Sequence, residues 1–323
     1  MNFPEPFVLS LEADSRCQLK CPACPTAMLQ DKFAEHKGAL KLEDFKIIVD
    51  SNPRVHTIEL SNAGEIFLNK ELPDIIEYAF YNGVHLTAKN GVNLNTASDK
   101  VLEAVVRFGF RHLNIALDGA TQKVYSQYRV NGKIERVLGH IRKIQDLKRK
   151  YRSPFPSLNW QFIVFGHNEH EIPKAREMAK RLGMTFNIKL PEDPNNISPV
   201  KNEEWVRKIA GAADRKEYLE KTHKHYIRGG CYMLWNAPQI DWDGSIHGCY
   251  RVPNKTFTGN AFEQPLSEWY HSEDLQYARD MLMNKVPEDK NSPCYECDLY
   301  KALSANKNWI TEEELWTNRL RIG

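Results

Sequence analysis

Seven cysteines stand out in this 323-residue sequence because they are grouped as metal ligands often are. Cys17, Cys21 and Cys24 lie close together near the start of the chain. The other four are all in its last third: Cys231, Cys249, Cys294 and Cys297. An odd number of cysteines argues against a disulfide framework. Core packing would scatter cysteines along the chain, so the grouping favours metal binding.

The first group, Cys17-x3-Cys21-x2-Cys24, follows directly on a short stretch that is expected to be a strand. Three thiolates at this spacing can hold three irons of a cubane cluster, which leaves the fourth iron open to another ligand. Thiolates suit both iron–sulfur clusters and zinc. A structural zinc site needs a fourth ligand, and the closest downstream candidate is His36.

The second group supplies four thiolates, which is a complete set for one further site. Between Cys231 and Cys249 lies the dipeptide Asp243-Gly244, a strong signal for a tight hairpin turn that brings the two arms together. Cys294 and Cys297 form a Cys-x2-Cys pair. A zinc ribbon and an iron–sulfur site fit this spacing about equally well.

The elements that position these cysteines alternate between β-rich runs and helical patterns over the first two thirds of the chain, as in βαβ units. The expected strands are Phe7–Glu12, Thr57–Leu60, His85–Ala88, His112–Leu117, Leu158–Val164 and Thr185–Lys189. The expected helices include Leu42–Ser51, Leu72–Asn82, Ser98–Phe108, Ile134–Tyr151 and Glu171–Leu182. The pattern predicts an α/β fold, an open and partial (β/α)6 TIM-type barrel, with sites at the carboxyl ends of the strands.

The rest of the chain has a different character. Residues 191–204 are rich in Pro and Asn and indicate a linker, which a polar helix from Trp205 to about Tyr226 is expected to follow. A hairpin, a helix near Leu266–Met283 and a polar helical end from Lys301 come next. We therefore expect four parts: a barrel over 1–190, a linker and helix over 191–228, a small cluster-binding domain over 229–300, and a tail over 301–323.

Charge and hydropathy exclude some partners. Lys and Arg number 44 against 42 Asp and Glu, a net charge of +2, so no overall field attracts nucleic acid or anionic membranes. No apolar run approaches the roughly 20 residues of a membrane helix, and acidic residues occupy the place of a secretory signal. The sequence predicts a soluble, cytoplasmic protein that binds neither nucleic acid nor membrane.

Residues 10–24, SLEADSRCQLKCPAC, resemble the signature of the radical S-adenosylmethionine (SAM) superfamily, and the resemblance extends over the first 190 residues. It implies a [4Fe–4S] cluster on Cys17, Cys21 and Cys24 that binds SAM. Further motifs after the next strands are similar to the family's SAM-binding motifs. They imply that SAM is contacted by Ala63, Gly64, Glu65, Asn90, Asp118 and Arg129.

Each of these motifs implies a particular contact with SAM. Glu65 ends a segment similar to the Gly-Gly-Glu motif that holds the SAM amino group, with Ala63 in place of a usual Gly. Arg129 resembles the arginine that meets the SAM carboxylate. Ala116 stands where the family commonly has Ser, so the resemblance does not extend to the ribose hydrogen bond of that Ser. Asp118 fits the SAM motif and, equally well, the N-cap of the helix that follows it.

The C-terminal group resembles the Twitch form of the SPASM domain, which carries one auxiliary [4Fe–4S] cluster. The resemblance therefore implies two [4Fe–4S] clusters and SAM as cofactors, and a flavodoxin- or ferredoxin-type electron donor. Four ligands on Cys231, Cys249, Cys294 and Cys297 leave no open position, so the auxiliary cluster would conduct electrons. Were one of the four not a ligand, its thiol could instead donate a hydrogen atom.

The family reaction is reductive cleavage of SAM to a 5′-deoxyadenosyl radical, which abstracts hydrogen from a C–H bond. We expect a radical SAM oxidoreductase that dehydrogenates a small carbohydrate- or aminocyclitol-like substrate. The alternatives are a radical epimerase, a peptide-modifying maturase and a non-catalytic iron–sulfur or zinc protein. The first expected strand begins at about Phe7, which leaves no room for a leader-binding domain before it and favours a small substrate. No motif identifies the catalytic base.

Overall fold

The computed structural model describes residues 3–28, 37–191, 197–251 and 255–322. A single nine-stranded sheet organises it, in the order β6-β5-β4-β3-β2-β1-β7-β8-β9. The strands are β1 Val8–Leu11, β2 Thr57–Glu59, β3 His85–Val92, β4 His112–Ala116, β5 Ser157–Ile163, β6 Thr185–Lys189, β7 Gln239–Ile240, β8 Ser245–Ile246 and β9 Phe257–Asn260. Strands β1 to β6 are all parallel, which confirms the predicted α/β partial barrel.

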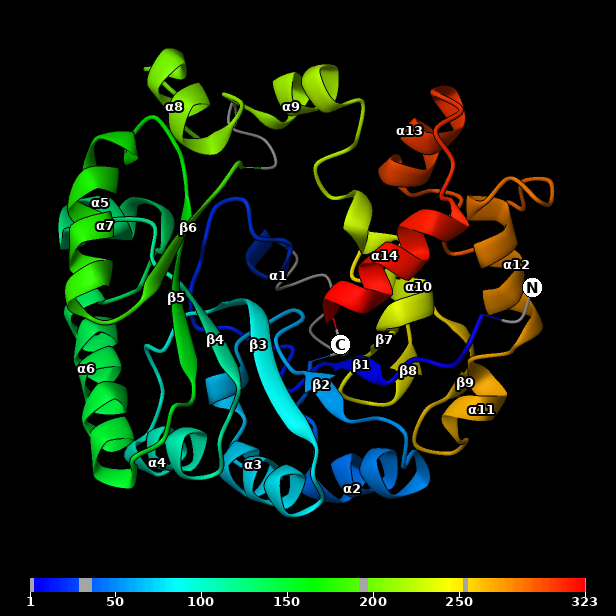
Figure 1. The fold of residues 1–323 in the computed structure, drawn as a ribbon, viewed down its shortest axis with the longest axis horizontal. Coiled ribbons are helices and arrows are strands. Elements are labelled where there is room, and N and C mark those ends of the chain that lie inside the picture. Colours follow the sequence, from blue (N-terminus) through cyan, green and yellow to red (C-terminus); the bar gives the residue numbers. More distant parts are fainter. Residues whose placement is uncertain (1–2, 29–36, 192–196, 252–254, 323) are drawn as a thin grey trace.

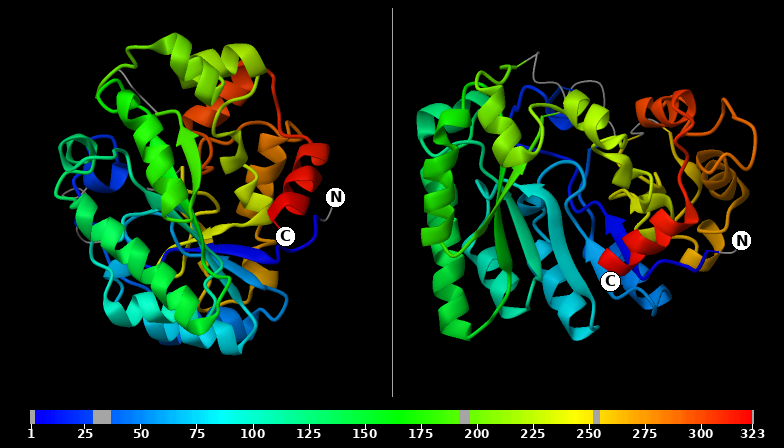
Figure 2. Two further views of the ribbon diagram at one scale, coloured as in Figure 1. Left: turned by 60° about the vertical axis from the view of Figure 1, so that its left-hand side comes forward. Right: turned by 45° about the horizontal axis from the view of Figure 1, so that its top comes forward.

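Helices cover the outer side of the parallel part of this sheet (Figures 1 and 2). They are α2 Leu42–Ser51, α3 Leu72–Tyr81, α4 Asp99–Arg107, α5 Gln122–Tyr128, α6 Ile134–Tyr151 and α7 Ile172–Arg181. In α6 the buried residues recur at helical spacing, from Ile134 through Val137 and Leu138 to Ile141 and Ile144. This apolar stripe packs toward the sheet and leaves the Lys- and Arg-rich face of the helix outside.

The expected boundaries of the six barrel strands hold closely, except at the end of β3. Strand β3 continues to Val92 through a register shift between Ala88 and Val92, where the sequence predicted an end at Ala88. Gly91, with φ of +110°, supplies the backbone conformation that this irregularity requires. Asn90 therefore lies inside an irregular strand rather than in a turn after it.

The C-terminal hairpin continues the barrel sheet instead of forming a sheet of its own. Strand β7 pairs parallel with β1 and antiparallel with β8. The backbone N–H of Glu12 donates to the carbonyl of Ile240 at 2.9 Å. Gly244, with φ of +85°, makes the tight turn that the Asp-Gly pair predicted. One continuous hydrophobic core runs from the barrel into this region.

Three predicted helices are wrong in extent. The helix expected over 205–226 is two helices, α8 Glu203–Ala210 and α9 Arg215–Thr222, because Gly211 adopts a left-handed conformation that ends α8. The helix near 266–283 is likewise α11 Leu266–Trp269 and α12 Glu273–Leu282. The helical end begins earlier than expected, with α13 Asp298–Ala305, and continues as α14 Glu312–Ile322.

The remaining helices are short, and include α1 Pro25–Met28 and α10 Met233–Asn236. Helices α10 to α14 gather beside β7 to β9, at the right of Figure 1, while α8 and α9 lie above the barrel strands. None of the helices in the described ranges is long and apolar enough to span a bilayer.

Candidate active site

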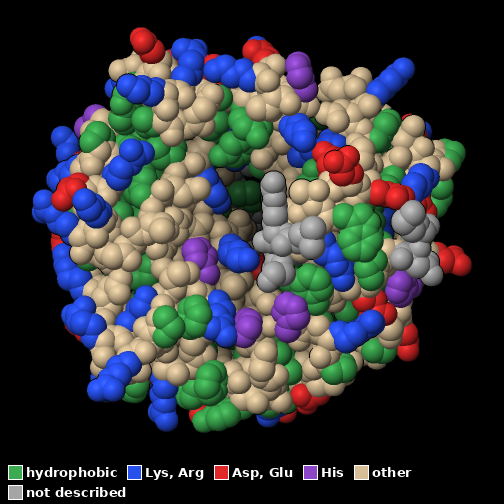
Figure 3. Space-filling model, in the orientation of Figure 1, with side chains coloured by type: hydrophobic (Ala, Val, Ile, Leu, Met, Phe, Trp, Pro, Cys, Tyr) green, Lys and Arg blue, Asp and Glu red, His purple; other side chains and the backbone are tan. Residues whose placement is uncertain are grey.

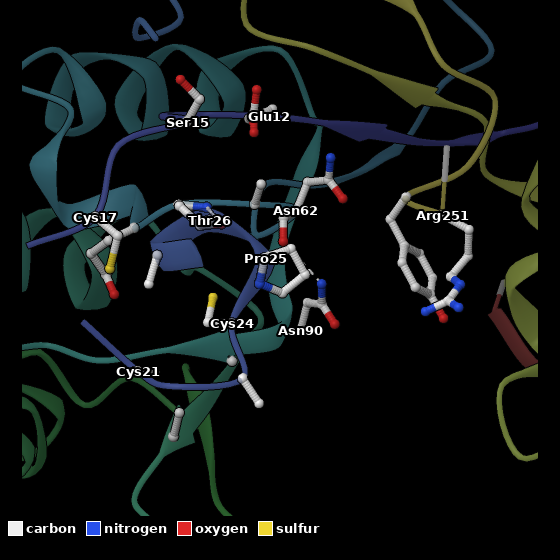
Figure 4. A pocket seen from close by; sticks show the side chains of 18 of the residues that line it. Glu12, Ser15, Cys17, Cys21, Cys24, Pro25, Thr26, Asn62, Asn90 and Arg251 are labelled. Carbon is white, nitrogen blue, oxygen red and sulfur yellow. Dashed lines mark hydrogen bonds between the residues drawn. The ribbon is translucent and has the colours of Figure 1, made fainter. Parts of the chain in front are cut away.

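A cavity of about 1230 Å³ opens at the carboxyl ends of the parallel strands, and its wall includes the C-terminal hairpin. Figure 3 shows this face of the molecule hollowed near its centre. The first three cysteines line the cavity from one side and Arg251, after β8, lines it from another (Figure 4). The carboxyl ends of parallel strands are where barrel folds place their active sites.

The loop after β1 presents Cys17, Cys21 and Cys24 to the cavity. Two side-chain N–H groups approach their sulfurs: Asn93 Nδ2 lies 3.9 Å from Cys17 Sγ, and Arg129 Nη1 lies 3.6 Å from Cys21 Sγ. Burial raises the pKa of Cys17 to about 12. A bound metal ion favours the thiolate form of such a thiol.

These three thiols fit the open cluster that the sequence predicts, because each lies on the wall of a cavity large enough for a further ligand. His36, the alternative fourth ligand for zinc, lies outside the described residues. The loop is also anchored from behind, since buried Leu19 and Cys21 pack with Tyr128 and Phe165.

Ala63, Gly64 and Glu65 line the same cavity after β2. Gly64 has φ of +62°, and a Cβ there would lie 2.0 Å from the carbonyl oxygen of Asp14, so the close approach of the two loops requires glycine. The Glu65 carboxylate is buried and accepts the backbone N–H groups of Phe67 at 3.2 Å and Asn93 at 2.6 Å. Burial raises its pKa to about 7.

Asn90 also lines the cavity, and its backbone N–H donates to Ser61 Oγ at 2.9 Å while its side chain donates to the carbonyl of Asn62 at 3.0 Å. The motifs after β2 and β3 are thus hydrogen-bonded to each other. Asn93 joins both to the cysteine loop, because it contacts Cys17 and Glu65 and accepts a hydrogen bond from Gln18 at 2.7 Å. Sequence reasoning missed Asn93; its position three residues after Asn90 was the available signal.

Arg129 reaches the cavity wall from the end of α5, whereas Asp118 does not line the cavity. Asp118 is completely buried behind Arg129 and forms an ion pair with its Nε at 2.5 Å. Its other oxygen accepts the N–H of Ile163 at 2.6 Å. The expected capping role is wrong, because Thr121 caps α5 through the N–H of Val124.

The four C-terminal cysteines line one small space, a pocket of about 10 Å³. The rest of its wall is largely apolar, including Leu234, Leu282, Leu299 and Tyr300. Burial raises the pKa of Cys231 and of Cys294, and the neighbouring thiols raise both further. No three His, Cys, Asp or Glu side chains in the described ranges converge closely enough to hold a single metal ion.

Buried arginines hold the segments that carry these thiols. Arg228, just before Cys231, pairs with Glu314 of α14 at 2.8 Å and donates to the carbonyls of Asn308 and Trp309. Arg279 of α12 donates to the carbonyl of Leu234 at 2.7 Å. The thiols therefore sit in a rigid, apolar enclosure, and a four-thiolate set in such an enclosure fits a fully ligated iron–sulfur cluster.

Comparison with known proteins finds one family model and several relatives that match this chain. Residues 231–298 match the family model of the SPASM iron-sulfur cluster-binding domain. A probable GTP 3′,8-cyclase of Methanocaldococcus jannaschii is 24% identical over 76% of this chain and 80% of its own length. The antilisterial bacteriocin subtilosin biosynthesis protein AlbA of Bacillus subtilis is 21% identical over 97% of this chain and 73% of its own length.

Two solved structures share the fold. Streptococcus suis SuiB bound to precursor peptide SuiA superposes with a TM-score of 0.63 at 14% identity, covering 92% of this chain and 71% of SuiB. BtrN in complex with AdoMet and 2-DOIA superposes with a TM-score of 0.52 at 13% identity, covering 91% of this chain and 94% of BtrN. At these identities the likeness is one of fold.

Proposed function

This chain is a radical SAM enzyme with a C-terminal SPASM domain, whose cofactors are SAM and [4Fe–4S] clusters, and we propose that it oxidises a peptide by two electrons. When bound, SAM and its cluster would supply a 5′-deoxyadenosyl radical that takes a hydrogen atom from a C–H bond, and the auxiliary cluster would accept the second electron while a proton leaves the substrate. What this chain's residues contribute is binding, orientation and exclusion of water.

In this proposal Cys17, Cys21 and Cys24 bind the cluster at the cavity wall. Glu65 faces the SAM ammonium, and its two backbone hydrogen bonds fix the carboxylate before SAM arrives. Arg129 faces the SAM carboxylate, and Asp118 holds it there as a positioning residue. Such charge-assisted hydrogen bonds are worth roughly 1.5–3 kcal/mol each.

The single observation that carries oxidation is the set of four C-terminal cysteines around one enclosed space. If all four are ligands, no open coordination position remains there. The other three cysteines of the chain belong to the first site. No cysteine thiol is then left to return a hydrogen atom to the substrate, which disfavours epimerisation.

The size of the cavity supports a second ligand beside SAM. Ligand pockets usually measure about 300–1,000 Å³, and this one is about 1230 Å³. A peptide is the favoured occupant because AlbA is named for bacteriocin biosynthesis and SuiB is bound to a precursor peptide. A carbohydrate- or aminocyclitol-like molecule is the second candidate, supported by the shared fold of BtrN with 2-DOIA.

The test is anaerobic incubation of the reconstituted enzyme with SAM, dithionite and either short peptides encoded beside its gene or a panel of aminocyclitols and sugars. We expect 5′-deoxyadenosine together with a peptide product two mass units lighter than its substrate. A product one mass unit heavier in deuterated water would identify an epimerase and overturn the oxidation. Conversion of the sugars alone would select the second candidate.

A further inference from the structure

One wall of the cavity is made by side chains that the proposed SAM and cluster sites do not use. Glu12 lies at the end of β1, on the segment that leads to the three cysteines (Figure 4). Gln239 and Asp241 lie at β7, which pairs with β1 in the register Ser10 to Gln239. Because side chains alternate along a strand, Glu12, Gln239 and Asp241 share the face opposite Leu11 and Ile240. All three line the cavity.

The carboxylates in and beside this wall differ in their partners. Asp241 lies 3.0 Å from His247 Nε2, and its Oδ1 accepts a hydrogen bond from Gln239 Nε2 at 3.4 Å. Asp14, which does not line the cavity, is held by Arg16 at 2.6 Å. Among the described residues, no Lys or Arg forms an ion pair with Glu12, although its side chain is buried. The groups that act on Glu12 are Asp241 and His247 of the hairpin and Asp14 of its own segment, besides the N–H of Trp242. Burial and Asp241 raise the pKa of Glu12 to about 8.

A second acceptor on the same wall is unsatisfied. Gln239 is 1% exposed, and its Nε2 donates to the carbonyl of Ile240 at 2.9 Å. This hydrogen bond fixes the amide, and its Oε1 has no hydrogen-bond partner within the part of the chain that the structure describes. A buried acceptor without a donor is costly, so this atom indicates a donor that arrives with a ligand.

We propose that Glu12, Asp241 and the Oε1 atom of Gln239 bind a primary ammonium group of the substrate. An ammonium offers three donors, one positive charge and no acceptor, which matches three acceptors on a wall whose basic group beside Glu12 and Asp241 is His247. The assignment rests on the proposed function, because it takes the cavity to be the substrate site. It narrows the substrate to a lysine-bearing peptide or an aminosugar.

The experiment is calorimetry at pH 7 on the reconstituted enzyme saturated with SAM and without reductant, using two matched probe pairs. One pair is the capped tripeptide Ac-Ala-Lys-Ala-NH2 and its Gln counterpart; the other is 6-amino-6-deoxyglucose and glucose. We expect the amine of one pair to bind about tenfold to a hundredfold tighter than its neutral counterpart. Binding should release protons, because burial and Asp241 raise the pKa of Glu12 in the absence of a bound amine.

Glu12→Gln should abolish both the preference for the amine and the proton release. Glu43→Gln, which changes a 77% exposed carboxylate on α2, should change neither. Preference in the peptide pair identifies a lysine ligand, and preference in the sugar pair identifies an aminosugar. No preference in either pair, or a preference that survives Glu12→Gln, overturns the subsite. Because no reductant is present, these outcomes are independent of whether the enzyme cleaves SAM.

Discussion

Replacing Asp118 with Asn should destabilise the protein and loosen Arg129. The change removes the charge that pairs with Arg129 at 2.5 Å, while the amide oxygen can still accept the N–H of Ile163. Breaking one side of a buried ion pair costs roughly 3–5 kcal/mol. Arg129 keeps Cys21 Sγ as a neighbour at 3.6 Å, so we expect the lower end, about 3 kcal/mol. At about 2 °C per kcal/mol, the melting temperature should fall by about 6 °C.

The assay is thermal unfolding of the reconstituted enzyme by circular dichroism, with Asp74→Asn as the matched control. Asp74 pairs with Lys100 at 2.9 Å, but both side chains are about half exposed or more, and such surface pairs contribute little. The double variant Asp118→Asn with Arg129→Gln should recover most of the loss, because it removes both buried charges. A melting temperature for Asp118→Asn equal to that of Asp74→Asn would refute the positioning role, as would strictly additive losses in the double variant.

Four further outcomes test other parts of the site. Glu65→Gln should weaken SAM binding about tenfold to a hundredfold, measured by equilibrium dialysis, with iron content unchanged. Gly64→Ala should reduce SAM binding and soluble yield, because its Cβ would meet the Asp14 carbonyl. The raised pKa of Glu12 makes the folded state bind a proton more tightly than the unfolded chain does. The free energy of unfolding should therefore fall as the pH rises from 4.5 to about 8. In denaturant titrations, Glu12→Gln should show a smaller fall over this range. Cys294→Ala should abolish product while 5′-deoxyadenosine still forms; a product of unchanged yield would remove Cys294 from the auxiliary site.

The repeating part of the fold could be predicted from sequence because its signals are local. Strand β6 and helix α6 have the predicted boundaries, since each is a single periodic pattern between clear breaks. The prediction of one polar helix over 205–226 was wrong at one residue. From sequence alone, a single Gly inside a helical pattern can either be tolerated or end the helix. At Gly211 the chain takes the left-handed conformation and the helix stops.

The candidate site, like the fold, could be predicted from sequence only in part. Cysteine spacing and the order of strand-end motifs located the cavity wall from Cys17 to Arg129 without coordinates. The position of Asp118 behind Arg129 could not be predicted, because a carboxylate after a strand fits a cap, a ligand contact and an ion pair equally well. Glu12 was missed for a different reason. Its neighbours Gln239 and Asp241 lie at β7, which is more than two hundred residues away in the sequence and pairs with β1 only in the folded chain.

The central claim, two iron–sulfur sites held by seven cysteines, is tested most directly by counting metal and sulfide after anaerobic reconstitution. Iron, zinc and acid-labile sulfide would be measured per chain for the wild type and for the triple variant of Cys17, Cys21 and Cys24 to Ala. We expect about eight irons and eight sulfides in the wild type, and about four of each in the variant, as two cubane clusters require. About four irons in the wild type together with one tightly bound zinc would contradict the account, since the C-terminal cysteines would then form a zinc site.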